Sequence, residues 1–80
     1  YKTAWLIDNG QDASMAASMA KFYASEVCNE IAAKTVQIHG GYGFIKDYKI
    51  ERMFRDCRVF TIYEGTSQVQ QMVISGKLLK

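Results

Sequence analysis

The longest periodic pattern in the chain predicts a helix from about Asp12 to His39. Apolar residues recur at helical spacing along this stretch, and polar residues gather on the opposite side. The apolar positions are Ala16, Ala20, Tyr23, Val27, Ile31 and Ile38, and the polar positions are Ser18, Lys21, Ser25, Asn29 and Glu30. Asp12 is a suitable N-cap. Gly40 and Gly41 can end the helix because glycine adopts positive φ at low cost.

Shorter helices are predicted on both sides of this long one. Residues 1–9 have the pattern of the last turns of a helix that stops at Gly10. After a loop over residues 43–48, residues 49–58 place apolar side chains on one side and predict a short helix.

The last part of the chain predicts a connector and a final helix. Residues 59–63 are β-branched and aromatic, which favours a strand, but no second strand is available to pair with them. We therefore expect an extended connector. Ser67 and Gln70 have the spacing of a capping box at the start of the final helix. The predicted fold class is all-α.

Composition excludes several classes of function. The net charge of +2 is too small to indicate nucleic-acid or anionic-membrane binding, and no apolar run approaches the length of a transmembrane helix. Cys28 and Cys57 do not form a C-x-x-C pair, so we expect free thiols, with Cys28 as a small buried residue of the long helix. One His and two distant Cys do not make a metal-ligand set. Because half of the residues are hydrophobic and the chain opens at Tyr1 within a helical pattern, we expect a part of something longer.

Glu64 is the leading candidate for chemistry. It lies between apolar and aromatic neighbours, and a carboxylate in such a setting is desolvated and becomes a usable proton acceptor near neutral pH. Gly65 lets a ligand approach the backbone, and the following helix start favours negative charge. From these residues alone, the commoner explanation is a carboxylate that merely complements a helix dipole.

Three motifs resemble the C-terminal helical domain of the FAD-dependent acyl-CoA dehydrogenases. They are Tyr63-Glu64-Gly65-Thr66-Ser67-Gln68, Gln37-Ile38-His39-Gly40-Gly41, and Glu51-Arg52-Met53-Phe54-Arg55-Asp56-Cys57-Arg58. The resemblance covers residues 1–80 and implies one C-terminal α-helical domain fragment. Its fold would be part of an antiparallel helical bundle that lacks the earlier helices.

The resemblance also implies roles for individual residues. Glu64 would be the catalytic base, Gly65 and Tyr63 would contact substrate, and the cofactor FAD would be contacted by Thr66, Ser67 and Gln68. A second FAD-contacting set, Gln37, Ile38, His39, Gly40 and Gly41, would reach the FAD of a neighbouring protomer. From composition alone, that second set is a helix stop and a turn, with His39 as a helix-terminus residue. Arg55 and Asp56 would position the catalytic loop, and Glu51 would pair with Arg55.

The implied activity is oxidation of acyl-CoA thioesters to 2,3-enoyl-CoA in fatty acid β-oxidation. Glu64 would remove the α-proton while the β-hydride passes to FAD. A Glu at this position implies short-chain, medium-chain or glutaryl-type substrates, among which a short-chain ester such as butyryl-CoA is the first hypothesis. The implied partners are an electron-transfer flavoprotein and further copies of the chain, as a tetramer or dimer, in the bacterial cytoplasm or the mitochondrial matrix. Two alternatives remain open: a non-catalytic helical oligomerisation module, and an acyl-CoA oxidase. The 80 residues alone would not complete an active site.

Overall fold

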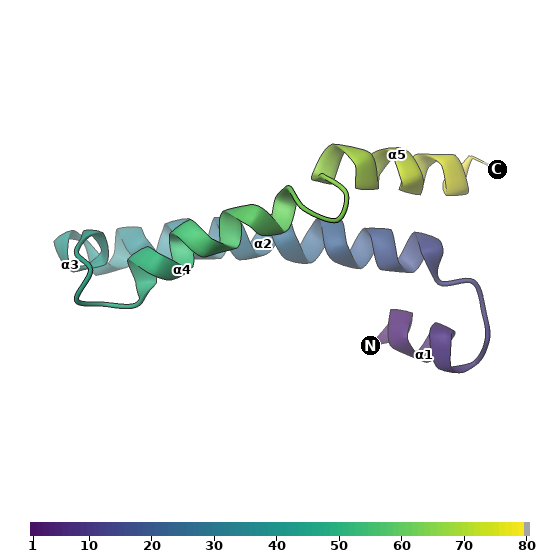
Figure 1. The fold of residues 1–80 in the computed structure, drawn as a ribbon, viewed down its shortest axis with the longest axis horizontal. Helices are drawn as coiled ribbons and strands as arrows, with labels where there is room; N and C mark the ends of the chain where they lie inside the picture. Colours follow the sequence, from purple (N-terminus) through teal and green to yellow (C-terminus); the bar gives the residue numbers. More distant parts are fainter. Residues whose placement is uncertain (80) are drawn as a thin grey trace.

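The computed structural model describes residues 1–79, in which every regular element is a helix. The α-helices are α1 (Lys2–Asp8), α2 (Ser14–His39), α3 (Gly41–Phe44), α4 (Ile50–Asp56) and α5 (Ser67–Leu78), and a 3₁₀ helix, η1 (Cys57–Thr61), follows α4 directly. Figure 1 shows α2 as a single rod through the whole molecule. The prediction of an all-α fold is confirmed.

The other helices all pack against α2. After α2, the chain turns through α3 and runs back antiparallel to it, first as α4 and η1 and then as α5 (Figure 1). The helix α1 precedes the first turns of α2 and also lies against it. The loop between η1 and α5, residues 62–66, lies beside the N-terminal half of α2, where Lys21 bonds to Gly65 (Figure 1).

The chain buries little of its apolar surface. Ala32 and Cys57 are the only apolar residues that are buried among the described residues. The radius of gyration is 16.0 Å, whereas about 12 Å is typical of a compact domain of this length. Large side chains such as Ile38 and Phe44 are more than four-fifths exposed. Apolar surface of this extent is normally covered by further protein.

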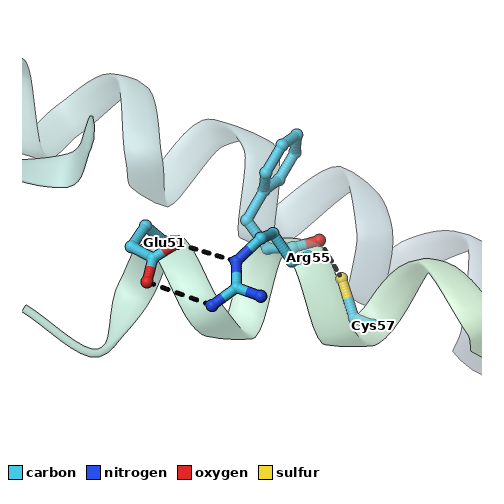
Figure 2. Close-up of polar contacts among 4 residues, drawn as sticks. Glu51, Arg55 and Cys57 are labelled. Carbon is cyan, nitrogen blue, oxygen red and sulfur yellow. Dashed lines mark hydrogen bonds and ion pairs between the residues drawn. The ribbon is translucent and has the colours of Figure 1, made fainter. Parts of the chain in front are cut away.

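Side-chain hydrogen bonds join η1 to α2 where apolar packing is thin. The Asn29 side-chain amide donates to the carbonyls of Ser25 and Cys57, both at 2.8 Å. The single S–H of Cys57 has two acceptors within reach: Asn29 Oδ1, 3.6 Å from the sulfur, and the Phe54 carbonyl, 3.4 Å from it. The dashed line at Cys57 in Figure 2 marks the second of these contacts. The pKa of the Cys57 thiol lies above its usual value. The main cause is burial, and the second is the neighbouring Cys28 thiol. Both cysteines are free thiols, and Cys28 is half-buried, less than the sequence predicts.

The predicted extended connector over residues 59–63 is wrong. Val59–Thr61 belong to η1, and the N–H groups of Ile62 and Tyr63 both donate to the Val59 carbonyl, at 2.9 and 3.0 Å. With no strand to pair with, the backbone satisfies its donors locally by continuing the helical turn. Tertiary packing against α2 therefore overrides the β-propensity of these residues.

The cap of the final helix is displaced by one residue. Thr66 is the N-cap of α5, and its Oγ1 accepts from the Val69 N–H at 3.2 Å. Ser67 is the first helical residue, and the Gln70 side chain reaches the carbonyls of the preceding loop. The predicted start of the helix is therefore correct to within one residue, but the cap residue is Thr66 and not Ser67.

The two ends of α2 also differ from their predicted forms. Ala13 is the N-cap of α2, while Asp12 accepts hydrogen bonds from the Ser14 N–H and hydroxyl at 3.0 and 2.7 Å. At the other end only Gly40 has positive φ, at 62°. Gly41 begins α3, which includes Gly43 and so replaces part of the predicted loop.

The predicted pair between Glu51 and Arg55 is present on α4. Arg55 donates to both carboxylate oxygens of Glu51, at 2.8 and 3.2 Å (Figure 2). The hydrogen bond from Arg55 is the main reason why the pKa of the Glu51 carboxyl lies below its ordinary value of 4.5.

A pH-dependent contribution to stability follows from this pair. A lowered pKa in the folded state means that the pair stabilises the fold above pH 4.5 and that this contribution is lost as the pH falls through the lowered pKa. We expect Glu51→Gln in the full-length protein to lower the thermal unfolding midpoint near neutral pH, with a difference from the unaltered protein that shrinks in acid. Arg55→Met should reproduce this profile. A difference that does not change with pH would contradict it.

Candidate functional site

The loop that carries Glu64 has an unusual backbone. Glu64 has φ of 53° and is the only non-glycine residue with positive φ within residues 1–79. Gly65 follows with φ of 92°. A long side chain held in the left-handed region costs about 1–3 kcal/mol and persists only where the surroundings enforce it. Such strain is concentrated at functional sites.

Two side chains from different helices hold this loop. The Lys21 ammonium, from α2, donates to the Gly65 carbonyl at 2.8 Å. The Gln70 amide, from α5, donates to the carbonyls of Glu64 and Gly65 at 3.2 and 3.3 Å. The Tyr63 ring lies 6.0 Å from Lys21 Nζ and also 6.0 Å from the Phe60 ring. The backbone around Glu64 is therefore held by hydrogen bonds from two helices, α2 and α5.

The N-terminus of α5 begins immediately after this loop. Ser67 is buried, and its hydroxyl donates to Glu26 Oε1 on α2 at 2.5 Å. Because that hydroxyl is engaged, the backbone N–H is the donor that Ser67 offers to a ligand. Gln68 is exposed, and Thr66 is half-buried. The N–H groups of the first turn of a helix favour an anionic or polar group in front of them.

The described residues give Glu64 less shelter than its sequence neighbours predict. Glu64 is exposed. A hollow of about 360 Å³ lies beside the loop, between α2 and η1, and Lys21, Phe60 and Tyr63 are among its lining residues. The expected desolvation of the carboxylate therefore requires a ligand or further protein over this face.

The second predicted set of site residues lies far from Glu64. Gln37, Ile38, His39, Gly40 and Gly41 are all exposed at the C-terminal end of α2. His39 Nδ1 lies 2.8 Å from the Thr35 carbonyl, as for a residue that ends a helix. From Lys21 to Gln37 the helix advances by 16 residues, which is about 24 Å at 1.5 Å per residue. One chain therefore does not bring the two sets together.

The larger grooves of the molecule lie elsewhere. One of about 700 Å³ runs between α2 and the α4–η1 segment, with Ile31, Met53 and Cys57 among its lining residues. Another of about 680 Å³ is lined by α2 and α4 residues such as Asn29 and Phe54. None of the residues predicted to be the base or to contact substrate or FAD lines either groove, whereas Asp56 lines the first groove and Arg55 the second.

Sequence reasoning missed the residues that hold the loop. Lys21 was assigned to the polar side of the long helix, and it bonds a residue 44 positions away. No local spacing marks such a contact. Gln70 was noticed for its capping spacing, but its partners are the loop carbonyls. Glu26, which holds Ser67, carried no signal at all.

Comparison with known proteins identifies the family. Residues 1–79 match the family model described as "Acyl-CoA dehydrogenase, C-terminal domain". The chain therefore belongs to the acyl-CoA dehydrogenase family, through its C-terminal domain.

Individual relatives match over the whole chain. It is 78% identical to "Caffeyl-CoA reductase-Etf complex subunit CarC" of Acetobacterium woodii and 59% identical to "3-(aryl)acrylate reductase" of Clostridium sporogenes, and it covers 21% of each. Among solved structures, butyryl-CoA dehydrogenase from Megasphaera elsdenii superposes with a TM-score of 0.98 at 41% identity. All of this chain and 21% of that one are covered. The chain thus spans about a fifth of the length of these relatives.

Proposed function

We propose that this chain is the catalytic and FAD-contacting part of a flavoprotein that interconverts acyl-CoA and 2,3-enoyl-CoA thioesters, with Glu64 as the residue that carries the α-proton. The observation that supports this most strongly is the backbone of Glu64, a strained residue held by Lys21 and Gln70 just before a helix N-terminus. Family membership supplies the reaction class.

In the direction of oxidation, the Glu64 carboxylate takes the α-proton as the C–H bond breaks. FAD, when bound, supplies the acceptor for the β-hydride. The carbonyl of the thioester has to be polarised, and an N–H aimed at the developing oxyanion does this. The N–H of Glu64 suits that role because it has no backbone acceptor among residues 1–79. Gly65 and Tyr63 then line the substrate side.

The described residues offer a suitable setting for FAD. Thr66, Ser67 and Gln68 present the first N–H groups of α5 next to Glu64. Gly40 and Gly41 have open space around them, since a Cβ added to either would meet nothing within 4 Å. We propose that this second turn contacts the FAD of a neighbouring protomer, because about 24 Å of α2 separates it from Glu64. A homo-oligomer, as a dimer or tetramer, follows from that arrangement.

The names of the relatives bear on the direction of the reaction. Two are reductases and one is a dehydrogenase. By microscopic reversibility the residue that removes the α-proton in oxidation returns it in reduction, so Glu64 serves either direction. We propose that the full-length protein acts on CoA thioesters that include aryl-substituted 2-enoyl esters, and exchanges electrons with an electron-transfer flavoprotein.

The test uses the full-length protein, purified and kept anaerobic. We expect a yellow protein whose flavin absorbance bleaches with butyryl-CoA or 3-phenylpropionyl-CoA. After chemical reduction, its colour should return on addition of cinnamoyl-CoA. A colourless protein that ignores CoA esters would support the non-catalytic module instead. Rapid reoxidation of the reduced protein by oxygen, with peroxide as product, would support the acyl-CoA oxidase.

A further inference from the structure

We propose that Lys21 is a positioning residue that fixes Glu64 for proton transfer. This inference rests on the proposed function of Glu64 and assigns a role to a residue outside the motifs that define it. The Lys21 ammonium reaches from α2 to the Gly65 carbonyl at 2.8 Å and lies 6.0 Å from the centre of the Tyr63 ring. One cation thus holds the residues immediately before and after Glu64.

The charge of Lys21 is directed at the loop and not at a carboxylate. The ion pairs within residues 1–79 involve Lys34, Arg55 and Lys77, and none involves Lys21. Lys21 is half-buried, so its hydrogen bond to a carbonyl is less exposed to competing water than one on the surface. A bond from a charged donor is stronger than one between neutral groups.

Gln70 shows why a second anchor is needed. Its amide bonds the Glu64 and Gly65 carbonyls at 3.2 and 3.3 Å, which are long distances for such bonds. Lys21 donates to the same Gly65 carbonyl from a different helix, α2, at the shorter distance of 2.8 Å. Together the two donors oppose the relaxation of Glu64 out of its left-handed backbone. Without Lys21, only the weaker contact remains.

Catalysis is sensitive to this anchor because proton transfer requires close approach. A base must come within hydrogen-bonding reach of the hydrogen that it removes, and a displacement of about 1 Å can lower the rate by about 10²-fold. Movement of the Glu64 carboxylate relative to the α-carbon would slow proton removal, while the binding of the thioester elsewhere on the protein continues.

The test compares Lys21→Met with Lys21→Arg and Lys34→Met in the full-length holoprotein. Lys21→Met should slow anaerobic flavin reduction by butyryl-CoA or 3-phenylpropionyl-CoA by about 10- to 100-fold, with the ester concentration for half-saturation changed less than threefold. Lys21→Arg should recover most of the rate because arginine can still donate to the Gly65 carbonyl. Lys34→Met is the matched control, since Lys34 lies on the same helix and only pairs with exposed Glu30 at 3.0 Å.

A second measurement separates positioning from general damage. Amide hydrogen exchange, followed by mass spectrometry, should accelerate in the peptide that covers residues 62–68 of the Lys21→Met protein, and not in the Lys34→Met protein. The α-deuterium isotope effect should be as large as, or larger than, that of the unaltered protein, because proton removal becomes slower relative to other steps.

The outcomes that overturn the positioning role differ from those that overturn the proposed function. Unchanged rate and unchanged exchange in Lys21→Met would eliminate the role of Lys21 while leaving Glu64 in place. Equal slowing by Lys21→Met and Lys21→Arg, without local exchange, would also eliminate it. Full flavin reduction in the Glu64→Gln protein would contradict the proposed function itself, because the base would then be another residue.

Discussion

Glu64→Gln in the full-length protein should abolish nearly all flavin reduction while leaving FAD and acyl-CoA binding intact. The amide has almost the same shape as the carboxylate but does not accept a proton, and positioned general bases contribute about 10²–10⁴-fold to rate. Glutamine can also keep the carbonyl contact to Gln70 and the backbone of residue 64, because neither uses the carboxylate. The measurement is the rate of anaerobic flavin bleaching by the ester that reduces the unaltered protein.

The matched control for this change is Glu30→Gln. Glu30 is an exposed acidic residue of α2 whose only ion pair among the described residues is with Lys34. The same loss of one negative charge there should leave the bleaching rate within about twofold, as for surface substitutions away from special features. Equal loss of rate in both variants, or retained reduction in Glu64→Gln, would place the base on another residue.

Gly43→Ala should be the most destabilising of the small substitutions in the turn between α2 and α4. A Cβ at residue 43 would lie 2.6 Å from the Val36 carbonyl oxygen and 3.0 Å from the Cβ of His39. The first of these is a backbone atom, so the turn has to move. Overpacking of this kind costs about 1–3 kcal/mol. We expect a lower thermal unfolding midpoint for the full-length protein and weaker retention of FAD, because the turn that would contact the cofactor is displaced.

Gly76→Ala is the control with the opposite sign. Gly76 is an exposed residue inside α5, and an added Cβ would meet nothing within 4 Å. Glycine within a helix is less favourable than alanine by roughly 0.5–1 kcal/mol. The Gly76→Ala protein should therefore unfold at the same or a higher temperature. A drop as large as that of Gly43→Ala would show that added volume, and not the close approach of α3 to α2, causes the loss.

The sequence predicts the helices well because their signals are local. The spacing of apolar residues, Gly10 and Gly40 identify α1 and α2 to within a few residues. The i,i+4 spacing of Glu51 and Arg55 identifies their pair on α4. The motif containing Glu64 points to the loop that the structure distinguishes by its backbone.

The errors of prediction come from contacts between distant parts of the chain. Residues 59–61 have strand propensity, yet they form a 3₁₀ turn because the chain offers no pairing strand and η1 packs against α2. The hydrogen bond from Lys21 to Gly65 spans 44 residues and follows from how η1 and α5 return along α2. Glu64 is exposed among residues 1–79, so the predicted shelter of its carboxylate would need atoms that these residues do not supply.

Under the proposed function, the length of α2 sets the distance between two flavins, one beside Glu64 and the other at the turn that follows the helix. Because about 24 Å of helix separates the turn at Gly40 from the Glu64 loop, a local change in that turn would act on the flavin of the neighbouring protomer and would leave the chain's own Glu64 loop in place. A substitution in that turn would therefore impair FAD binding in the adjacent protomer, while the Glu64 of the altered protomer could still take a proton. In an assembly that mixes altered and unaltered protomers, the number of impaired active sites would then depend on how the copies are arranged around each other.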